Sequence, residues 1–426
     1  MLFRVNRLAA GLVLAGCTHL VQAAGFALIE QNASGLGNAY AGQAAAATDA
    51  STVFFNPAGM GMLPDAQLVV AGNLIKPSAE FQNGGSTAAP LQTLGGTGGD
   101  AGGLALVPNF YYAHPVSKEL ALGIGMNAPF GLKTEYDQTW MGRFQAVTSE
   151  VKTINLNPSL SYKVNDRAIL GVGLNGQYIE ATLTNMVNYS ALAAGALGTN
   201  LEGLAEVEGD DYGWGYNLGV LFDLGNTRIG LSYRSEIDYT LEGSVNFADV
   251  PAAMAGNALL QTGPVTADVT MPASASLSLF HKFSPSVDVL ADITWTGWSV
   301  FDALTVRRTS GTVVSSTTEN WQDSWRYSLG VTWHQDAAWT WRAGVAYDET
   351  PVEDAYRTPR IPDESRTWVA LGGQYRLSGK AALDFGYAYL FVEDASINST
   401  VAGAGTLLGN YENSVNILSV QYTHNF

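Results

Sequence analysis

Apolar and polar residues alternate with a period of two along most of this 426-residue chain. That period marks a β-strand, whose successive side chains point to opposite faces. The stretch in which Ile154, Leu156 and Leu160 alternate with asparagines and serines is typical. Fourteen such segments are predicted as strands: 65–78, 102–114, 119–129, 151–163, 167–182, 212–223, 227–242, 269–283, 286–300, 322–334, 337–350, 363–378, 380–393 and 410–426.

The connections between these segments alternate between long loops and short turns. Outer-membrane barrels have long extracellular loops and short periplasmic turns. An even strand count also places both chain ends on the periplasmic side. The pattern therefore predicts an all-β fold, a fourteen-stranded antiparallel transmembrane β-barrel. The short turns are expected at 114–118, 164–166, 223–226, 284–285, 335–336 and 378–379.

A membrane location is favoured by the scarcity of charge. Charged residues make up 14% of the chain, against about 25% in typical soluble domains. No apolar run beyond the N-terminus reaches the ~20 residues of a membrane helix, so a closed barrel is the remaining way to satisfy the backbone in lipid. Leu418, Tyr422 and Phe426 share one face of a final strand that ends on Phe, as outer-membrane barrels typically do. A soluble strand is the alternative.

The first 23 residues are predicted to be a signal peptide. Arg4 and Arg7 provide its positive start, residues 8–17 its apolar core, and Val21-Gln22-Ala23 its cleavage site. Removal of the two arginines leaves 19 of the 21 basic residues against 38 acidic ones, a net charge of −19. The sequence contains no cluster of basic residues that could neutralise phosphates, so no nucleic-acid partner is expected.

The signal peptide contains a second, competing motif. Leu14-Ala15-Gly16-Cys17 also fits the box at which bacterial lipoproteins are cleaved and acylated on cysteine. Cys17 is the only cysteine, so a mature chain cleaved at Ala23 would have neither thiol nor disulfide. A lipoprotein with an acylated Cys17 stays open as an alternative.

Motifs of enzymes and metal sites are missing from the sequence. It contains no Gly-x-Ser-x-Gly elbow, no His-Glu-x-x-His motif and no cysteine pair for zinc. We therefore expect no catalytic residues, no metal and no cofactor. A lipid hydrolase using Ser276 and His281, a structural barrel and an aqueous porin are more distant alternatives. The histidines beyond the signal peptide lie at turns or strand ends: His114, His281, His334 and His424.

Residues 24–64 precede the first predicted strand and are rich in glycine and alanine, without sustained strand alternation. A segment of this length at the periplasmic end of a wide barrel can fill the lumen. The expected domains are therefore a signal peptide (1–23), an N-terminal hatch that plugs the barrel (24–64) and the barrel with its extracellular loops (65–426).

Two long loops, 183–211 and 243–268, are unusually apolar. Leu192 and Leu197 lie in the first, and Leu259 and Leu260 in the second. Both loops are expected to be partly helical. They either pack on each other as a cap or form an exposed apolar surface on which a ligand lands, and the two interpretations are compatible.

Several ordered motifs spread over the chain resemble the FadL family of outer-membrane transporters for long-chain fatty acids and other hydrophobic compounds. The motifs are Ala24-Gly25-Phe26, the run 34–42 (SGLGNAYAG), Asn56-Pro57-Ala58, the run 127–132 (NAPFGL) with 134–136 (TEY), 233–236 (YRSE), 341–348 (WRAGVAYD) with Pro351, and Ile361-Pro362-Asp363. The family fold is a fourteen-stranded barrel plugged by an N-terminal hatch, which agrees with the strand count above.

The resemblance implies a transport path. A hydrophobic ligand would be captured between the two apolar loops and would then bind in an internal pocket near the mature N-terminus. Movement of the hatch would open a path, and the ligand would leave sideways through the barrel wall at a kink in the third strand. The ligand-binding and gating residues implied here are Phe26, Leu28, Asn56, Pro57, Ala58, Asn127, Pro129, Phe130 and Gly131.

The kink also has a basis in the residues themselves. Pro129 cannot donate to a strand ladder, and Gly131 adds a weak point two residues later. Local pairing should therefore fail near these residues, although an ordinary strand end would look the same. The motif Asn56-Pro57-Ala58 could likewise be a simple turn.

One feature departs from the family. Members that carry fatty acids pair the carboxylate with basic side chains in the lumen, but the expected positions, 178–182 and 317–321, hold no lysine or arginine. Nearby Arg326 could substitute. Long-chain fatty acids stay the first expectation, with aromatic hydrocarbons or oxidised fatty acids as alternatives. The expected partners are a hydrophobic small molecule and the lipid and lipopolysaccharide of the outer membrane. The protein is expected to be a monomer, and the transport is expected to be passive.

Overall fold

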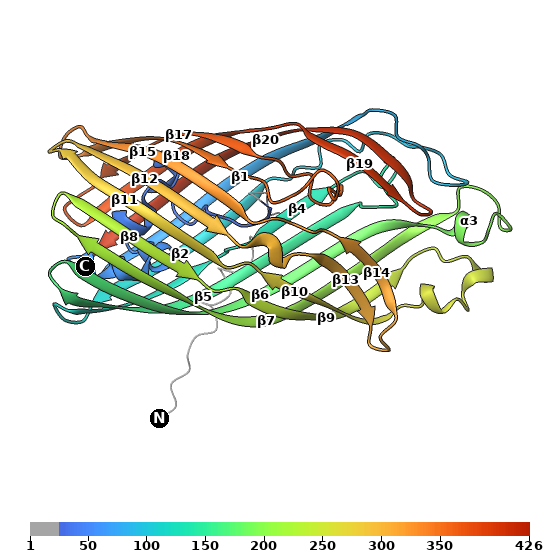
Figure 1. Ribbon diagram of the computed structural model, residues 1–426, viewed down its shortest axis with the longest axis horizontal. Helices are drawn as coiled ribbons and strands as arrows, with labels where there is room; N and C mark the ends of the chain where they lie inside the picture. Colours follow the sequence, from blue (N-terminus) through green and yellow to red (C-terminus); the bar gives the residue numbers. More distant parts are fainter. Residues whose placement is uncertain (1–24) are drawn as a thin grey trace, which may run out of the picture.

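The computed structural model describes residues 25–426, which form one closed antiparallel β-barrel (Figure 1). The predicted signal peptide and Cys17 lie outside the described residues. The ring closes because β1 (Gln67–Asn83) pairs with β2 (Ala105–Pro115) on one side and with β20 (Gly405–Asn425) on the other.

Twenty strand segments make up fourteen barrel strands, because six of these are interrupted. The other uninterrupted strands are β5 (Thr148–Asn165), β6 (Ala168–Asn188), β7 (Glu202–Asp223), β16 (Trp339–Asp348) and β17 (Arg366–Arg376). The interrupted strands are β3 (Leu120–Asn127) with β4 (Gly131–Glu135), β8 (Thr227–Arg234) with β9 (Ile237–Phe247), β10 (Gly263–Met271) with β11 (Ser274–Ser284), β12 (Val287–Thr296) with β13 (Ala303–Arg308), β14 (Val313–Thr318) with β15 (Ser324–His334), and β18 (Ala381–Val392) with β19 (Ala395–Val401). The predicted fourteen-stranded barrel is confirmed.

The period of two places apolar side chains outside and polar ones inside. On β15, Tyr327 and Leu329 are exposed on the outer face, whereas Arg326 and Ser328 are buried in the lumen. The same inversion of a soluble protein's distribution recurs on β7, where Trp214 is 77% exposed. An outer surface of this kind is stable against lipid, because it presents no backbone edge and few polar groups to the bilayer.

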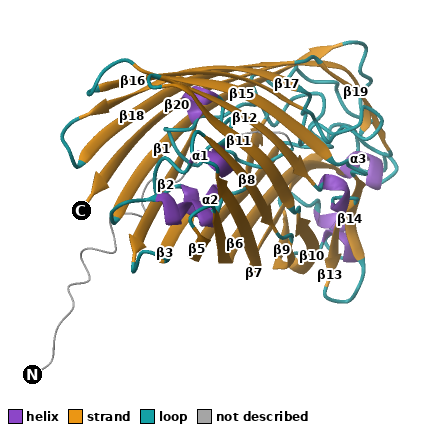
Figure 2. Cartoon of the chain, turned by 60° about the vertical axis from the view of Figure 1, so that its left-hand side comes forward, coloured by secondary structure: helices purple, strands orange, loops and turns teal. Residues whose placement is uncertain are grey.

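The hatch lies inside the ring of strands (Figure 2). It contains four short helices, η1 (Leu36–Asn38), α1 (Gln43–Ala46), α2 (Thr52–Phe55) and η2 (Pro57–Met62). Wall glycines permit its close approach. A Cβ added at Gly230 would lie 2.0 Å from the carbonyl oxygen of Ala44, and one at Gly344 would lie 2.2 Å from the carbonyl carbon of Asn38. None of the helices within residues 25–426 has both the length and the apolar character to cross a membrane.

The two apolar loops differ from the prediction. Most of 183–211 is strand, because β6 continues to Asn188 and β7 begins at Glu202, with only α3 (Tyr189–Leu192) between them as helix. The expected loop boundaries were therefore wrong. The second loop contains η3 (Ala252–Met254) and η4 (Ala258–Leu260). The extended β6–β7 hairpin escaped prediction because its inner face packs on other loops, which removes the alternation with solvent. For example, Met186 packs against Ala89 and Phe144.

Candidate functional site

Four neighbouring barrel strands are interrupted at the same height. Their lower edges stand side by side, because Ser274 pairs with both Arg234 and Thr296, and Thr296 also pairs with Ser324. We call the residues above them that lie outside the regular strands the seam: residues 235–236, 272–273, 297–302 and 319–323. The sequence predicted strands through most of this region, so the interruptions correct the predicted strands 227–242, 269–283 and 286–300.

Aromatic residues of the seam, of the N-terminal segment and of the interruption between β3 and β4 form one cluster in the lumen, which we call the aromatic partition. It consists of Phe26, Phe130, Trp298, Phe301 and Trp321, all buried. Phe26 is its centre, with ring-centroid distances of 4.7 Å to Trp298 and 5.7 Å to Trp321. A side chain at Gly25 would collide with the same tryptophans, because an added Cβ would lie 2.7 Å from Trp321 and 2.8 Å from Trp298.

The N-terminal residues repair the interruption in the third barrel strand. Between β3 and β4, the amide of Leu28 donates to the carbonyl of Pro129 at 2.8 Å, and the amide of Gly131 donates to the carbonyl of Phe26 at 2.9 Å. Ala27 and Phe130 form an isolated antiparallel bridge. Residues 26–28 thus act as a short substitute strand at the point where the chain itself leaves the ladder.

An upper cavity of about 70 Å³ lies on the extracellular side of the partition. Its wall is almost entirely apolar. The ionisable residues that line it are Glu208, Glu319 and Arg360. The Arg360 guanidinium is held by neutral acceptors, donating to the Ser149 hydroxyl at 3.0 Å and to the Thr148 carbonyl at 3.2 Å. The apolar lining includes Leu132, Val151, Ile179, Leu241, Val269 and Phe26.

The protonation states in the upper cavity follow from burial. Burial raises the pKa of Glu319, in the irregular segment before β15, to about 8, and the positive charge of Arg360 opposes that rise. Burial lowers the pKa of Arg360, in the loop after β16, to about 10, and Glu319 opposes that fall. At neutral pH the cavity therefore holds a charged guanidinium beside a largely protonated carboxyl group.

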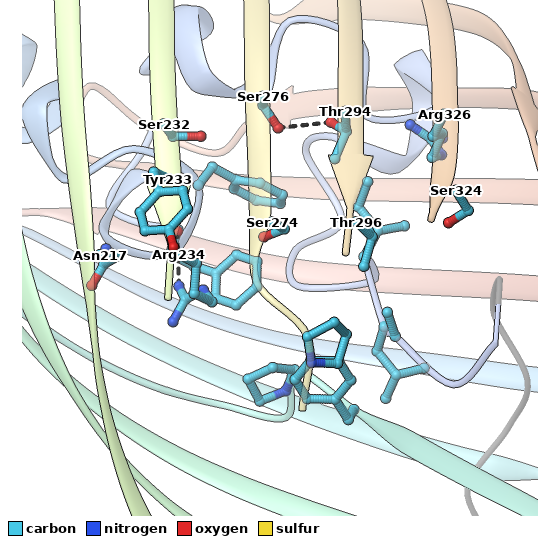
Figure 3. Close-up of a pocket in the computed structure, with 18 of the residues that line it drawn as sticks. Asn217, Ser232, Tyr233, Arg234, Ser274, Ser276, Thr294, Thr296, Ser324 and Arg326 are labelled. Atoms are coloured by element: carbon cyan, nitrogen blue, oxygen red, sulfur yellow. Dashed lines mark hydrogen bonds between the residues drawn. The ribbon is translucent and has the colours of Figure 1, made fainter. Parts of the chain in front are cut away.

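A lower cavity of about 140 Å³ lies beneath the partition (Figure 3). Its hatch side is apolar and includes Leu28, Phe54 and Phe55, together with Pro129 and Phe130 from the interrupted third strand. Its wall side is polar. The wall presents six serine and threonine side chains, two arginines and one aspartate: Ser232, Ser274, Ser276, Thr294, Thr296, Ser324, Arg234, Arg326 and Asp348. The Ser276 and Thr294 hydroxyls are hydrogen-bonded at 2.7 Å.

The two arginines of the lower cavity hold the hatch against the wall. Arg234 donates to the Asn175 side chain and, at 3.1 Å, to the carbonyl of Phe54, and its guanidinium lies 4.4 Å from the Phe54 ring centroid. Arg326 donates to the carbonyl of Ala39 at 2.7 Å. The segments in which lumen cations were sought, 178–182 and 317–321, do line the upper cavity through Ile179, Ala181 and Glu319, but the cations lie elsewhere: Arg326, named as a substitute, and also Arg234 and Arg360.

The sequence did not show that Arg360 and Arg234 lie beside cavities. Arg360 belongs to the loop 349–365, which folds inward, so it reaches a cavity whose other walls come from distant strands. Arg234 sits on an inward position of β8 within a motif recognised for its resemblance alone. Its inward parity was readable from the alternation, but its place beside a cavity was not.

An outer vestibule of about 560 Å³ opens above the upper cavity. It is bounded by 315–318, 355–360 and 398–401, and it shares Leu183, Val207 and Arg360 with the upper cavity. Three of its lining residues, Leu183, Asn185 and Val207, belong to the first of the two predicted apolar loops, 183–211. Leu192, Leu197 and Leu259 are exposed at the tips of those loops.

The predicted site residues separate into two groups. Phe26 lines the upper cavity, Leu28, Pro129 and Phe130 line the lower one, and Gly131 pairs with Phe26. Asn127 lines neither of these cavities, and its side chain accepts from Asn155 at 3.1 Å within the wall.

Asn56, Pro57 and Ala58 also line neither cavity. The Asn56 amide donates to the carbonyls of Ala44 at 2.7 Å and Val220 at 3.1 Å, and its oxygen accepts from the Ala58 amide at 3.0 Å. This motif therefore ties the hatch to β7, and a Cβ at the facing Gly219 would lie 1.9 Å from the Asn56 side-chain oxygen.

Comparison with known proteins agrees with this architecture. A family model described as outer membrane protein transport protein (OMPP1/FadL/TodX) matches residues 14–426. The long-chain fatty acid transport protein of Salmonella typhi is 30% identical, and the match covers 88% of this chain and 89% of that protein. The crystal structure of a Pseudomonas aeruginosa FadL homologue has a TM-score of 0.88 at 27% identity, covering 95% and 100% of the two chains. The P. putida toluene transporter TodX, at 19% identity, a TM-score of 0.68 and coverages of 89% and 94%, shares the fold.

Proposed function

The chain belongs to the outer membrane protein transport protein family (OMPP1/FadL/TodX), and from this premise we propose that it carries long-chain fatty acids passively across the outer membrane. The family places it among outer-membrane transporters of hydrophobic compounds. The relative of Salmonella typhi is named for long-chain fatty acid transport. The ligand of this chain is the part that needs support from its own residues.

The supporting observation is a buried guanidinium in an apolar cavity. Arg360 faces the upper cavity, is held only by neutral acceptors, and forms no ion pair within 4 Å among the described residues. A buried cation is stabilised by an anion, so the cavity suits a molecule that is apolar along its length and anionic at one end. A fatty acid has that form, and a neutral hydrocarbon would leave Arg360 uncompensated.

The proposed path follows the cavities in order. Ligand enters the vestibule, fills the upper cavity, passes the partition when Phe26 moves, and reaches the lower cavity. Residues 26–28 are held to the third strand by two backbone hydrogen bonds and by the packing of Phe26 on Phe130, so their withdrawal would free the interruption at 128–130 as a lateral exit. In this scheme Phe26, Leu28, Pro129, Phe130 and Gly131 gate the path. Asn56, Pro57, Ala58 and Asn127 act by anchoring the moving parts.

We propose the following roles for the parts of the chain. Residues 1–23 serve as a cleaved signal peptide, 24–64 as the hatch and 65–426 as the barrel. The protein works as a monomer surrounded by outer-membrane lipid and lipopolysaccharide, without nucleic acid, metal or cofactor. It catalyses no reaction, so net flux is driven by partition and by consumption of the ligand downstream.

Oxidised fatty acids are a second candidate, and one observation favours them. The lower cavity presents a wall of six hydroxyl side chains. A hydroxylated acyl chain could exchange hydrogen bonds with that wall, whereas a saturated chain could not. Aromatic hydrocarbons, the ligands named for the toluene transporter TodX, find no comparable support, because both cavities contain arginine.

The test is ligand uptake by cells that lack their own hydrophobic transporter and express this chain. Radiolabelled oleate, a hydroxylated C18 acid and toluene are compared, and heat-modifiable gel migration verifies a folded barrel. Uptake of oleate that falls on Arg360→Gln substitution supports the proposal. Uptake of toluene alone, unaffected by that substitution, overturns it. Preference for the hydroxylated acid would select the second candidate.

A further inference from the structure

A buried cluster of charges borders the lower cavity on three adjacent strands and the hatch. Arg326 pairs in register with Asp348, and Asp348 with Arg366, so the three stand in one inward-facing row. The Arg366 guanidinium contacts Asp363 at 2.5 Å and Asp348 at 3.8 Å. The fifth member is Glu30 of the hatch, which is 1% exposed. All five side chains are nearly inaccessible to solvent.

Arg326 is the cation of this cluster with unused donors. Its Nη2 donates to the carbonyl of Ala39, but its Nε and Nη1 have no hydrogen-bond partner. It forms no ion pair within 4 Å among residues 25–426, and its guanidinium lies 5.0 Å from the Trp368 ring centroid. It lines the lower cavity, where Figure 3 shows it on the polar wall. Two buried guanidinium nitrogens therefore lack an acceptor next to a cavity.

Glu30 is the carboxyl group of the cluster that forms no ion pair within 4 Å among the described residues. Its Oε2 has no hydrogen bond, while its backbone carbonyl is fixed by the side chains of Asn73 at 2.7 Å and Asn109 at 3.2 Å. The charged groups acting on it are Arg326, Arg366 and Asp348 from the wall, and its own charge acts on Tyr40 of the hatch. Burial raises the pKa of Glu30 to about 7, against the opposing effect of the arginines.

The charge balance of the cluster is uneven. Three carboxyl groups, Glu30, Asp348 and Asp363, accompany two guanidinium groups. Asp348 and Asp363 both lie within ion-pair distance of Arg366. With all three carboxyl groups ionised, the cluster carries one excess negative charge. With Glu30 protonated, the cluster is neutral, and a carboxylate of the ligand at the free N–H groups of Arg326 takes the place of the Glu30 charge.

We propose that the lower cavity is a second binding site for the carboxylate of the ligand, which Arg326 binds through its free N–H groups, and that Glu30 takes up a proton when the site is filled. This rests on the proposed function, since it requires an anionic ligand. A ligand carboxylate replaces Glu30 as the counter-ion of Arg326, and two buried anions beside one cation would repel each other. Binding and proton uptake are therefore linked.

The test is calorimetric titration of the detergent-solubilised full barrel with laurate at pH 7 and pH 8, in two buffers of different ionisation enthalpy. The difference between buffers gives the number of protons taken up, which should be about half a proton at pH 7 and close to one at pH 8. Dodecanol, the uncharged analogue, should bind without proton uptake. A detergent-only titration provides the blank.

Variants assign the proton and the carboxylate. Glu30→Gln should bind laurate without proton uptake near pH 7, and Arg326→Gln should reduce the preference for laurate over dodecanol about tenfold or more. Glu319→Gln should retain the uptake at pH 7, which excludes the upper cavity as its source. Arg228→Gln is the matched control, because Arg228 is a lumen arginine that stacks on Phe280 away from both cavities.

The outcomes separate the two proposals. Proton uptake lost in Glu30→Gln and retained in Glu319→Gln supports the site. Laurate binding by the wild-type chain without proton uptake, or uptake that persists in Glu30→Gln, overturns it and leaves the proposed function standing. Absence of any laurate binding overturns the proposed function, and the site with it. Heat-modifiable migration confirms that each variant used is folded.

Discussion

The upper and lower cavities both combine apolar side chains with arginine, but polar side chains make up a much larger share of the lower cavity. The upper cavity is an apolar chamber with one arginine and one buried glutamate, Arg360 and Glu319. The lower cavity is half apolar and half hydroxyl-lined, with two arginines on its polar wall. The aromatic partition around Phe26 separates them.

The difference teaches how an apolar molecule can be held and then released. An apolar chamber gains affinity from every methylene it buries, roughly 0.8 kcal/mol each. A hydroxyl-lined chamber gains less from the same chain, because its polar groups lose water on contact. A ligand that passes the partition therefore moves from a site that binds its apolar tail tightly to a site that binds the tail weakly. The second site lies next to the interruption at 128–130.

Closing the interruption should have the largest effect. Replacing Pro129 and Gly131 together with Val restores an N–H donor and strand propensity, so the third strand should pair continuously and uptake of oleate should fall to background. Laurate binding in the upper cavity should persist, because that cavity lies above the partition. Pro108→Val in β2 is the control, as it removes a proline from an uninterrupted strand. Uptake that survives in a folded double variant would contradict a lateral exit.

Removing the partition should have the next largest effect. Phe26→Ala deletes the ring at the centre of four aromatic contacts, which should cost about 3–5 kcal/mol of unfolding free energy. The two cavities should merge, and bound brominated fatty acid should be resolved in a single continuous density. Two separate cavities in a crystal structure of this variant would show that other residues divide the lumen.

Neutralising the upper arginine should weaken binding by an intermediate amount. Arg360→Gln removes a charge-assisted hydrogen bond worth about 1.5–3 kcal/mol, so laurate affinity should fall about tenfold or more while dodecanol affinity changes little. Equilibrium binding with both ligands measures this. Arg308→Gln, on exposed β13, is the control. An equal loss for both ligands would mean that Arg360 supports the fold rather than the headgroup.

The smallest expected effect is a pH dependence in the upper cavity. The pKa of Glu319 is raised to about 8, so the group is neutral below that pH and becomes an anion above it. Once ionised it competes for Arg360 and repels a carboxylate, so laurate affinity should fall as pH rises through about 8, by at most about tenfold per pH unit. Glu319→Gln should abolish the fall. An unchanged profile in that variant would assign the titration elsewhere.

Much of the fold could be predicted because its rules are local. The period of two identifies each strand, and the alternation of short and long connections gives their order, so the count of fourteen and the closing strand at Phe426 follow from the sequence. The small residues of 24–64 likewise indicated a plug. Pro129 and Gly131 marked the interrupted third strand through their own backbone chemistry.

The site could be predicted only in part, because its parts meet across long separations. Phe26 and Phe130 were named by resemblance, but Trp298, Phe301 and Trp321 were read as strand or loop residues, since nothing local marks the seam. Arg326 was named as a substitute cation, but the place of Arg360 beside the upper cavity was missed for the same reason. Arg360 reaches its cavity through an inward-folding loop, and Arg326 gained its importance from the unused N–H groups that the packing leaves.

The sequence by itself determined a closed barrel, its strand number and which face of each strand meets lipid, because a two-residue period and backbone hydrogen bonding in a bilayer leave few other solutions. Only the tertiary structure decided where the wall is interrupted, which rings fill the interruptions and which charges remain unpaired. These depend on pairing register and on contacts between residues as distant as Gly25 and Asp363, and such contacts leave no periodic trace in the chain.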